Sequence, residues 1–246
     1  MMRLLVSVRD VDETLAAVRA GVDFVDFKEP GAGALGGLPL ATIRALVDAL
    51  HDEGVGLPLS ATIGDLTDPD AIRAQVDAVG RCGVDYVKVG IQRDDPAAPA
   101  LLEWLSDCGH AVVPVFIADQ GIDPELVAMA AELPFPALMA DTADKLAGSL
   151  FDVAGLCELH AFVEMVRGAG KLAGLAGALQ LSHIPVLMAL ETDFAGFRSA
   201  VCQGDRAGTL DPALLARLRA ALRPAQAPAR RSWPSSSERM RVMSVR

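Results

Sequence analysis

The sequence predicts an α/β protein with the (β/α)8 architecture of a TIM barrel, because eight apolar runs alternate with eight amphipathic stretches between residues 3 and 221. Apolar runs suit strands that are buried on both faces of a parallel sheet, and amphipathic stretches suit the helices that cover it. The chain has 246 residues, 52% of them hydrophobic, which is enough for one such barrel. We therefore expect a single barrel domain over residues 1–222.

The elements follow one another in strict alternation. The predicted strands span residues 3–8, 23–28, 57–63, 86–91, 111–117, 137–141, 172–177 and 193–199. The predicted helices span residues 12–20, 39–52, 69–81, 97–108, 123–132, 156–169, 183–190 and 211–221. Four prolines stand near helix starts, where the missing N–H group costs nothing: Pro39, Pro69, Pro124 and Pro212.

The last residues, 223–246, differ in composition from the rest. They hold six arginines and one acidic residue, and they are rich in Ser, Pro and Ala, which predicts a disordered or extended tail. The net charge of the whole chain is −10, so residues 1–222 carry −15. Because nucleic-acid backbones are bound mainly by Lys and Arg, the acidic body argues against a nucleic-acid partner, although the tail alone could touch RNA, DNA or anionic lipid.

Further features narrow the class of protein. No apolar stretch reaches the ~20 residues that a membrane span needs. The four cysteines show no CxxC pair, which speaks against a zinc or redox site. We expect a cytoplasmic protein that needs neither a membrane, a metal nor a cofactor, and self-association into a homo-oligomer stays open.

One sequence pattern occurs twice, 62 residues apart, in Gly21–Lys28 (GVDFVDFK) and Gly83–Gly90 (GVDYVKVG). The offset matches two βα units. Because side chains alternate along a strand, Asp26, Lys28 and Lys88 share one face. The other face is apolar and should contact the helices, with Val25, Phe27, Val87 and Val89. The three charged residues are therefore expected inside the barrel, at the strand ends where such barrels hold their active sites.

Only four of the 22 basic residues are lysines, and three of them belong to this side of the barrel. Lys145 follows the strand that Asp141 closes, so both are expected near Lys28 and Lys88. Lys171 begins a strand on the opposite face, where a surface or helix-capping role is expected. Buried charges cost several kcal/mol unless paired, and a structural ion pair of Asp26 with Lys88 is the alternative to a catalytic cluster.

Clustered lysines favour Schiff-base chemistry. Only a neutral amine attacks a carbonyl carbon, and burial together with a second cation favours the neutral form. A second lysine and nearby carboxylates can then move the protons that carbon–carbon bond formation and dehydration require. This is the chemistry of a lysine-dependent aldolase.

A series of segments spread over residues 2–221 carries a resemblance to a known family. They are Leu4–Ser7, Asp26–Pro30, Gly33–Gly36, Ser60–Asp65, Asp85–Gly90, Asp141–Lys145, Leu172–Gly177, His183–Pro185 and Gly196–Cys202. In order and spacing the sequence resembles the (5-formylfuran-3-yl)methyl phosphate synthase family. The resemblance implies a lyase that condenses two molecules of glyceraldehyde 3-phosphate, with loss of phosphate and water, to the furan precursor of methanofuran-type one-carbon carriers.

The resemblance also implies roles for individual residues. Lys28 corresponds to the Schiff-base lysine and Lys88 to the proton acceptor. Asp26, Asp141 and Lys145 match polar positions of the family's site, with supporting roles in proton transfer and substrate positioning.

A phosphorylated substrate needs an anion site, which such barrels often build after their seventh and eighth strands. The candidate substrate- and phosphate-binding residues are Ser7, Gly174, Gly177, Gly196, Arg198 and Gly204. Glycines at strand ends serve turns equally often. The segment Cys202–Arg206 (CQGDR) is one glycine shorter than the family's CxGGDR pattern.

Residues 31–36 match the GxGxxG pattern of dinucleotide sites. The following helix begins only after Leu38, outside the motif, so a mobile loop over the site is the better interpretation. Two other functions stay open: a Schiff-base aldolase for another phosphorylated sugar, and a non-catalytic barrel that binds a phosphorylated ligand.

Overall fold

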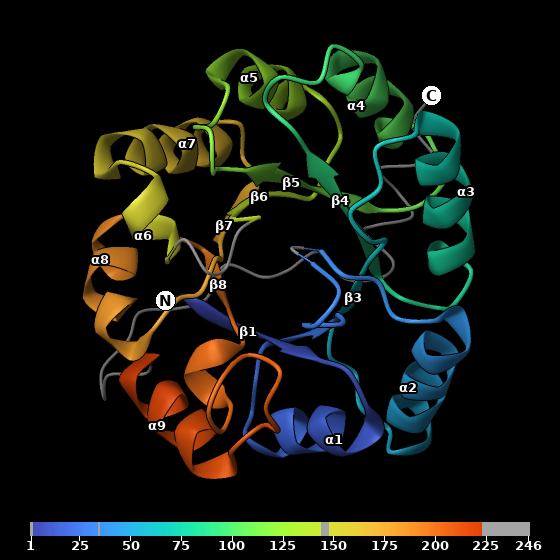
Figure 1. Ribbon diagram of the computed structural model, residues 1–246, viewed down its shortest axis with the longest axis vertical. Coiled ribbons are helices and arrows are strands. Elements are labelled where there is room, and N and C mark those ends of the chain that lie inside the picture. Colours follow the sequence, from blue (N-terminus) through green and yellow to red (C-terminus); the bar gives the residue numbers. More distant parts are fainter. Residues whose placement is uncertain (1, 34, 144–147, 223–246) are drawn as a thin grey trace.

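The computed structural model describes residues 2–33, 35–143 and 148–222, which form a closed barrel of eight parallel strands inside a ring of helices (Figure 1). Around the barrel, the strands follow their order in the chain, and β8 pairs with β1. The strands are β1 (Arg3–Val8), β2 (Phe24–Phe27), β3 (Leu59–Thr62), β4 (Tyr86–Ile91), β5 (Val112–Ile117), β6 (Ala137–Asp141), β7 (Leu172–Leu175) and β8 (Phe194–Phe197). This confirms the (β/α)8 prediction.

Each predicted helix is present, with ends within two residues of those expected. The helices are α1 (Val11–Arg19), α2 (Leu40–Asp52), α3 (Pro69–Gly80), α4 (Ala98–Ser106), α5 (Pro124–Glu132), α7 (Leu156–Gly168), α8 (Ile184–Ala189) and α9 (Pro212–Leu222). Three short helices that the sequence did not predict follow the last three strands: α6 (Leu150–Val153), η1 (Leu181–His183) and η2 (Ser199–Val201). Segments of three or four residues are too short to show a helical period.

Local chemistry explains where several helices begin. Asp10, Asp68 and Asp123 precede α1, α3 and α5, and each side chain accepts a hydrogen bond from a first-turn amide. Such N-caps satisfy amides that lack a partner within the helix. Pro69 and Pro124 then occupy the first helical position, as expected.

The apolar core has two layers. The outer one lies between strands and helices and contains Val25, Phe27, Val87 and Val89, as the alternation predicted. The inner one fills the barrel, where the rings of Phe24 and Phe194 meet edge to face with centroids 5.7 Å apart. Phe24 and Phe194 are the first residues of their strands, at the amino-terminal end of the barrel, whereas Ile117, the last residue of β5, and Ala176, just after β7, extend the layer to the carboxyl ends.

The repeated pattern has a structural basis. Asp23 and Asp85 precede β2 and β4, and each accepts a hydrogen bond from the backbone of the preceding strand, at Leu4 N (3.0 Å) and Leu59 N (2.9 Å). Both repeats thus anchor one strand to its neighbour at the amino-terminal end of the barrel.

Lys145 and the tail 223–246 lie outside the described residues. Within the described ranges, every helix is too short or too polar to cross a membrane.

Candidate active site

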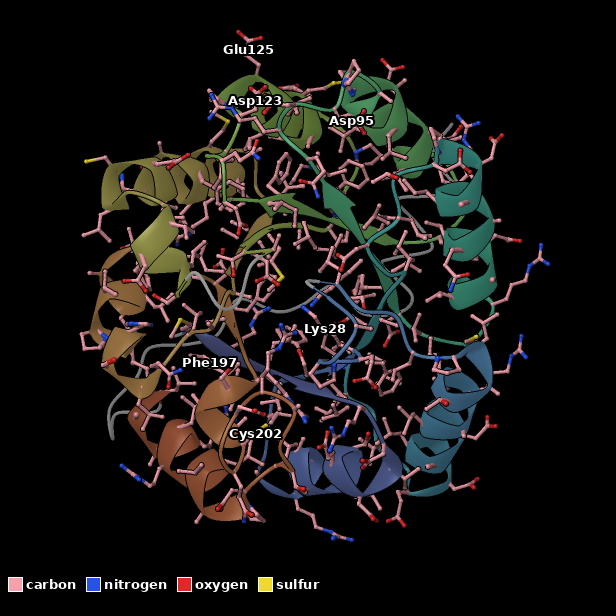
Figure 2. All side chains as sticks on the ribbon, in the orientation of Figure 1. Lys28, Asp95, Asp123, Glu125, Phe197 and Cys202 are labelled. Carbon is pink, nitrogen blue, oxygen red and sulfur yellow. The ribbon has the colours of Figure 1, made fainter. Side chains whose placement is uncertain are left out.

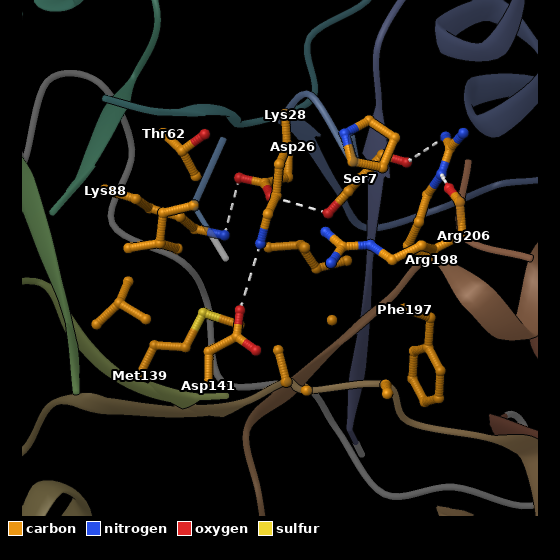
Figure 3. Close-up of a pocket in the computed structure, with 18 of the residues that line it drawn as sticks. Ser7, Asp26, Lys28, Thr62, Lys88, Met139, Asp141, Phe197, Arg198 and Arg206 are labelled. Atoms are coloured by element: carbon orange, nitrogen blue, oxygen red, sulfur yellow. Dashed lines mark hydrogen bonds and ion pairs between the residues drawn. The ribbon is translucent and has the colours of Figure 1, made fainter. Parts of the chain in front are cut away.

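A cavity opens at the carboxyl ends of the strands and encloses about 600 Å³, including space continuous with solvent (Figure 3). Lys28, near the barrel axis, belongs to the wall of this cavity, whereas Asp95, Asp123 and Glu125 lie at the periphery of the molecule, at the starts of α4 and α5 (Figure 2). Asp26, Lys88 and Asp141 also line the cavity, so their predicted placement is confirmed.

Asp26 is the centre of a hydrogen-bonded group that the strand register creates. It lies level with Ser7 on β1 and Ser60 on β3. Its Oδ2 accepts from Ser7 Oγ at 3.0 Å, and its Oδ1 accepts from Ser60 Oγ at 2.6 Å. Lys88 Nζ lies 2.8 Å from the same Oδ1. With three donors around it, the carboxylate is well suited to fix Lys88 in place.

Lys28 pairs with a different carboxylate. Its Nζ lies 3.4 Å from Oδ2 of Asp141, and both side chains are almost fully buried. Asp141 ends β6, and its Oδ1 accepts a hydrogen bond from Thr142 N at 2.7 Å. The ammonium of Lys28 is thus held less closely than that of Lys88, and both amines point into the same cavity (Figure 3).

The ion pair of Asp26 with Lys88 that formed the structural alternative therefore exists. It does not stand alone, because Lys28 and Asp141 form a second buried pair in the same cavity wall. Buried pairs seldom stabilise a fold on balance, so two of them beside one cavity favour a functional site.

The candidate phosphate-binding residues divide into two groups. Ser7, Gly177 and Gly196 line the cavity, whereas Gly174 and Gly204 are not part of its described wall. A Cβ on Gly174 would lie 2.1 Å from the ring of Phe194, so this glycine makes room for the barrel core. Gly204 adopts a φ of +79° in an exposed turn. Gly174 therefore makes room for Phe194, and phosphate binding by either glycine stays a prediction.

Arg198 requires a correction, although its side chain lines the cavity. Its two terminal nitrogens donate to both carboxylate oxygens of Glu13 and to the carbonyls of Ser7 and Gly208. Its Nε donates to the carbonyl of Arg206. All five N–H groups of the guanidinium are thus occupied by protein acceptors. The expected direct contact of Arg198 with phosphate does not fit this geometry.

Arg206 is the cation that the sequence reasoning did not select. Its half-buried side chain lines the cavity, and Nη2 donates to the carbonyl of Gly33 at 3.2 Å. Burial lowers the pKa of the Arg206 guanidinium, against the opposing effect of the Asp141 carboxylate, yet an arginine stays charged at neutral pH. The only sequence signal for it was the CQGDR segment, which ends at this residue.

The segment after β2 covers one side of the cavity. Pro30 and Leu35 belong to the wall, and Leu35 packs into the inner core of the barrel. Leu35 N donates to Asp65 Oδ1 at 2.9 Å, and Thr62 Oγ1 donates to the carbonyl of Gly36 at 2.9 Å. The expected covering position is confirmed, and the motion of this segment stays a prediction.

Lys171 lies on the opposite face, as expected. Its Nζ donates to the carbonyls of Leu133 and Phe135, just beyond the end of α5. Burial lowers the pKa of this amine. The predicted capping role is confirmed.

Across the described ranges, no three His, Cys, Asp or Glu side chains are grouped so that they could hold a metal ion.

The fold and this cavity define a TIM-barrel protein with paired lysines and aspartates at the carboxyl ends of its strands. The chain belongs to the 4-HFC-P synthase family, whose sequence profile matches residues 4–219. The Archaeoglobus fulgidus protein named (5-formylfuran-3-yl)methyl phosphate synthase is 31% identical, over 88% of this chain and 97% of that protein. The Methanopyrus kandleri protein of the same name is 34% identical, over 83% and 91%. A Methylorubrum extorquens relative with a provisional form of this name is 39% identical, over 90% and 92%.

Solved structures agree on the fold. Phosphoribosyl anthranilate isomerase from Thermus thermophilus superposes with a TM-score of 0.61 at 18% identity, covering 90% of this chain and 98% of that one. Thiamine phosphate pyrophosphorylase from Pyrococcus furiosus gives a TM-score of 0.59 at 14% identity, covering 90% and 95%. The family resemblance is thus confirmed by the sequence relatives and the barrel by the structures.

Proposed function

We propose that this protein is a cytoplasmic lyase that condenses two molecules of glyceraldehyde 3-phosphate into (5-formylfuran-3-yl)methyl phosphate, through a Schiff base on Lys28. The observation that carries the proposal is the pair of buried lysines in one cavity, each beside its own carboxylate, in a chain of this synthase family. The product would be the furan precursor of methanofuran-type one-carbon carriers.

The covalent step begins at Lys28. Its Nζ transfers a proton to Oδ2 of Asp141, over the 3.4 Å that separates them. The neutral amine attacks the carbonyl carbon of a first triose phosphate, and the carbonyl oxygen leaves as water to give an iminium ion. The iminium withdraws electrons from the neighbouring carbon, which makes its C–H bond acidic.

Lys88 then takes the proton from that carbon. Its Nζ first passes a proton to Oδ1 of Asp26 over 2.8 Å, which frees the amine to act as a base. The resulting enamine carbon attacks the carbonyl carbon of a second triose phosphate. Overall, two triose phosphates give one furan phosphate, one inorganic phosphate and two waters, so the reaction needs no oxidant.

The cavity also offers groups for the substrate phosphate. The guanidinium of Arg206 supplies a half-buried positive charge. Gly177, two residues after β7, and Gly196, within β8, line the cavity and are the proposed backbone contacts of the anion. Ser7 acts through its hydrogen bond to Asp26. Lys145 stays a predicted supporting residue outside the described ranges.

Borohydride trapping tests the proposal. Wild-type protein is incubated with glyceraldehyde 3-phosphate, reduced and digested, and the peptide that contains Lys28 is expected to carry the mass of the reduced adduct. Lys28→Ala should give neither adduct nor furan product. Lys171→Met is the matched control, because Lys171 is a half-buried lysine that lies on the opposite face. It should retain both signals.

Identification of the product separates the alternatives. An adduct on Lys28 with a product other than the formylfuran phosphate would indicate a Schiff-base aldolase for another phosphorylated sugar. Absence of both adduct and product would indicate a non-catalytic barrel. Product formation by Lys28→Ala would disprove the Schiff base on Lys28.

A further inference from the structure

We infer that Glu13 of α1, which lies outside the described cavity wall, is a positioning residue that sets the place of Arg206 in the cavity. The inference rests on the proposed function, because it takes Arg206 to bind the substrate phosphate.

Glu13 is only 2% exposed and is the anchor of a small charged cluster. Its two carboxylate oxygens accept from the two terminal nitrogens of Arg198, in the paired geometry that gives the strongest hydrogen bonds between these groups. Arg9 also contacts the Glu13 carboxylate: its backbone N lies 3.1 Å from Oε2 and its Nε lies 3.5 Å from Oε1. One buried carboxylate therefore orients two arginines.

The two arginines hold three consecutive carbonyl groups of the segment between β8 and α9. Arg198 Nε donates to the carbonyl of Arg206 at 2.8 Å, and its Nη2 donates to the carbonyl of Gly208 at 2.8 Å. Arg9 Nη1 donates to the carbonyl of Ala207, between them, at 2.6 Å. The backbone of Arg206 is therefore held directly by side chains that Glu13 orients.

This support matters because residues 203–208 are mostly exposed and belong to no helix or strand. Their base is closed by an antiparallel bridge of Cys202 with Leu210 and by a hydrogen bond from Gln203 N to the carbonyl of Thr209. Beyond this base, the segment is tied to the body by the hydrogen bonds that Arg9 and Arg198 donate to its carbonyls, by the bond of Arg206 to Gly33 and by a bond from Gln203 Nε2 to Asp211. Loss of the Glu13 charge should therefore displace Arg206 while the barrel stays intact.

Binding of inorganic phosphate, followed by isothermal titration calorimetry, tests this role. Glu13→Gln removes the charge and one of the two acceptors for Arg198, so we expect the dissociation constant for phosphate to rise about tenfold. Arg206→Gln should abolish binding. Asp23→Asn is the matched control, because Asp23 pairs with Arg219 in a similarly buried ion pair at the amino-terminal end of the barrel. It should bind phosphate as the wild type does.

Steady-state kinetics distinguish weaker substrate binding from a general loss of stability. Glu13→Gln should raise KM for glyceraldehyde 3-phosphate about tenfold and change kcat by less than about threefold, because ground-state phosphate binding is lost and the lysines are untouched. Arg198→Lys keeps the charge but loses the planar fork that reaches several acceptors at once, and it should behave like Glu13→Gln.

The outcomes are distinct. Suppose that Arg206→Gln no longer binds phosphate. If Glu13→Gln or Arg198→Lys then binds phosphate with the affinity of the wild type, the role of Glu13 is overturned. Wild-type affinity in Arg206→Gln would instead overturn the phosphate assignment of the proposed function. Failure of both Glu13→Gln and Arg198→Lys to fold, with Asp23→Asn folded, would show that the cluster supports the barrel, and this too would overturn the inference.

Discussion

At the scale of single residues, Asp26 holds one wall of the cavity together, because its carboxylate contacts one ammonium and two hydroxyl groups. Asp26→Ala would leave the buried ammonium of Lys88 without its partner. Removal of one member of a buried ion pair typically costs about 3–5 kcal/mol. We expect a loss of about 3 kcal/mol in the free energy of unfolding, measured by urea denaturation, together with loss of product formation.

Ser60→Ala is the graded comparison for Asp26→Ala. It removes one hydroxyl donor but leaves the ion pair, so the expected loss is about 1 kcal/mol. Equal losses for the two variants would contradict the view that the charge of Lys88 dominates this group.

Gly174 tests whether a glycine of β7 serves packing or ligand binding. A Cβ at this position would lie 2.1 Å from the ring of Phe194, so Gly174→Ala should destabilise the protein by about 1–3 kcal/mol. The double variant Gly174→Ala/Phe194→Leu should recover part of this loss in thermal unfolding. Gly168→Ala in α7, where a Cβ meets open space, is the control and should be neutral or stabilising. A lower phosphate affinity with unchanged stability would support the ligand role.

Residue roles differ in how far the sequence could predict them. The alternation of side chains along strands was sufficient to place Asp26, Lys28 and Lys88 inside the barrel. The hydrogen-bond acceptors of Arg198 are Glu13, 185 positions earlier in the chain, and carbonyl groups of a loop. Contacts of that separation leave no local pattern, so the hydrogen bonds that occupy Arg198, and the place of Arg206 in the cavity wall, could be found only in the structure.

At the scale of elements, α9 begins with a cap that titrates. Asp211 accepts from the amides of Ala213 and Leu214, and these hydrogen bonds lower the pKa of its carboxyl group below the ordinary value. A lowered folded-state pKa means that the cap stabilises the protein above the unfolded-state pKa, and that this contribution disappears as the pH falls through the folded-state pKa.

We therefore expect Asp211→Ala to have a lower Tm than the wild type at pH 7, with a gap that closes as the pH falls below about 4. Differential scanning calorimetry at several pH values measures both. Asp52→Asn, at the last residue of α2, should show no comparable gap at pH 7. A gap for Asp211→Ala that persists unchanged at low pH would show that the carboxylate is not its source.

The elements themselves were predictable because each strand is a short apolar run and most helices carry a proline or aspartate at their start. The three short helices α6, η1 and η2 were not predictable in this way. Each follows one of the last three strands, on the side of the cavity. One of them, η2, contributes Ser199 to the wall of the cavity.

At the scale of the whole molecule, the barrel closes where β8 pairs with β1, and α9 packs beside this seam against α1 and β1 (Figure 1). Its Leu215, Leu218 and Leu222 are fully buried. Burial of three leucine side chains contributes about 5 kcal/mol or more, which approaches the whole net stability of a typical domain. We therefore expect stable closure of the barrel to need the last helix.

Two truncations test this view of the molecule. A chain that ends after Leu210 lacks α9 and should lose cooperative thermal unfolding in circular dichroism. A chain that ends after Leu222 keeps α9 and the region that the family profile matches, residues 4–219, so it should retain the Tm and the product-forming activity of the full chain. Loss of activity with an unchanged Tm in this longer truncation would show instead that residues 223–246 contribute to the site. Cooperative unfolding of the shorter one would show that the β1 and β8 pairing alone closes the barrel.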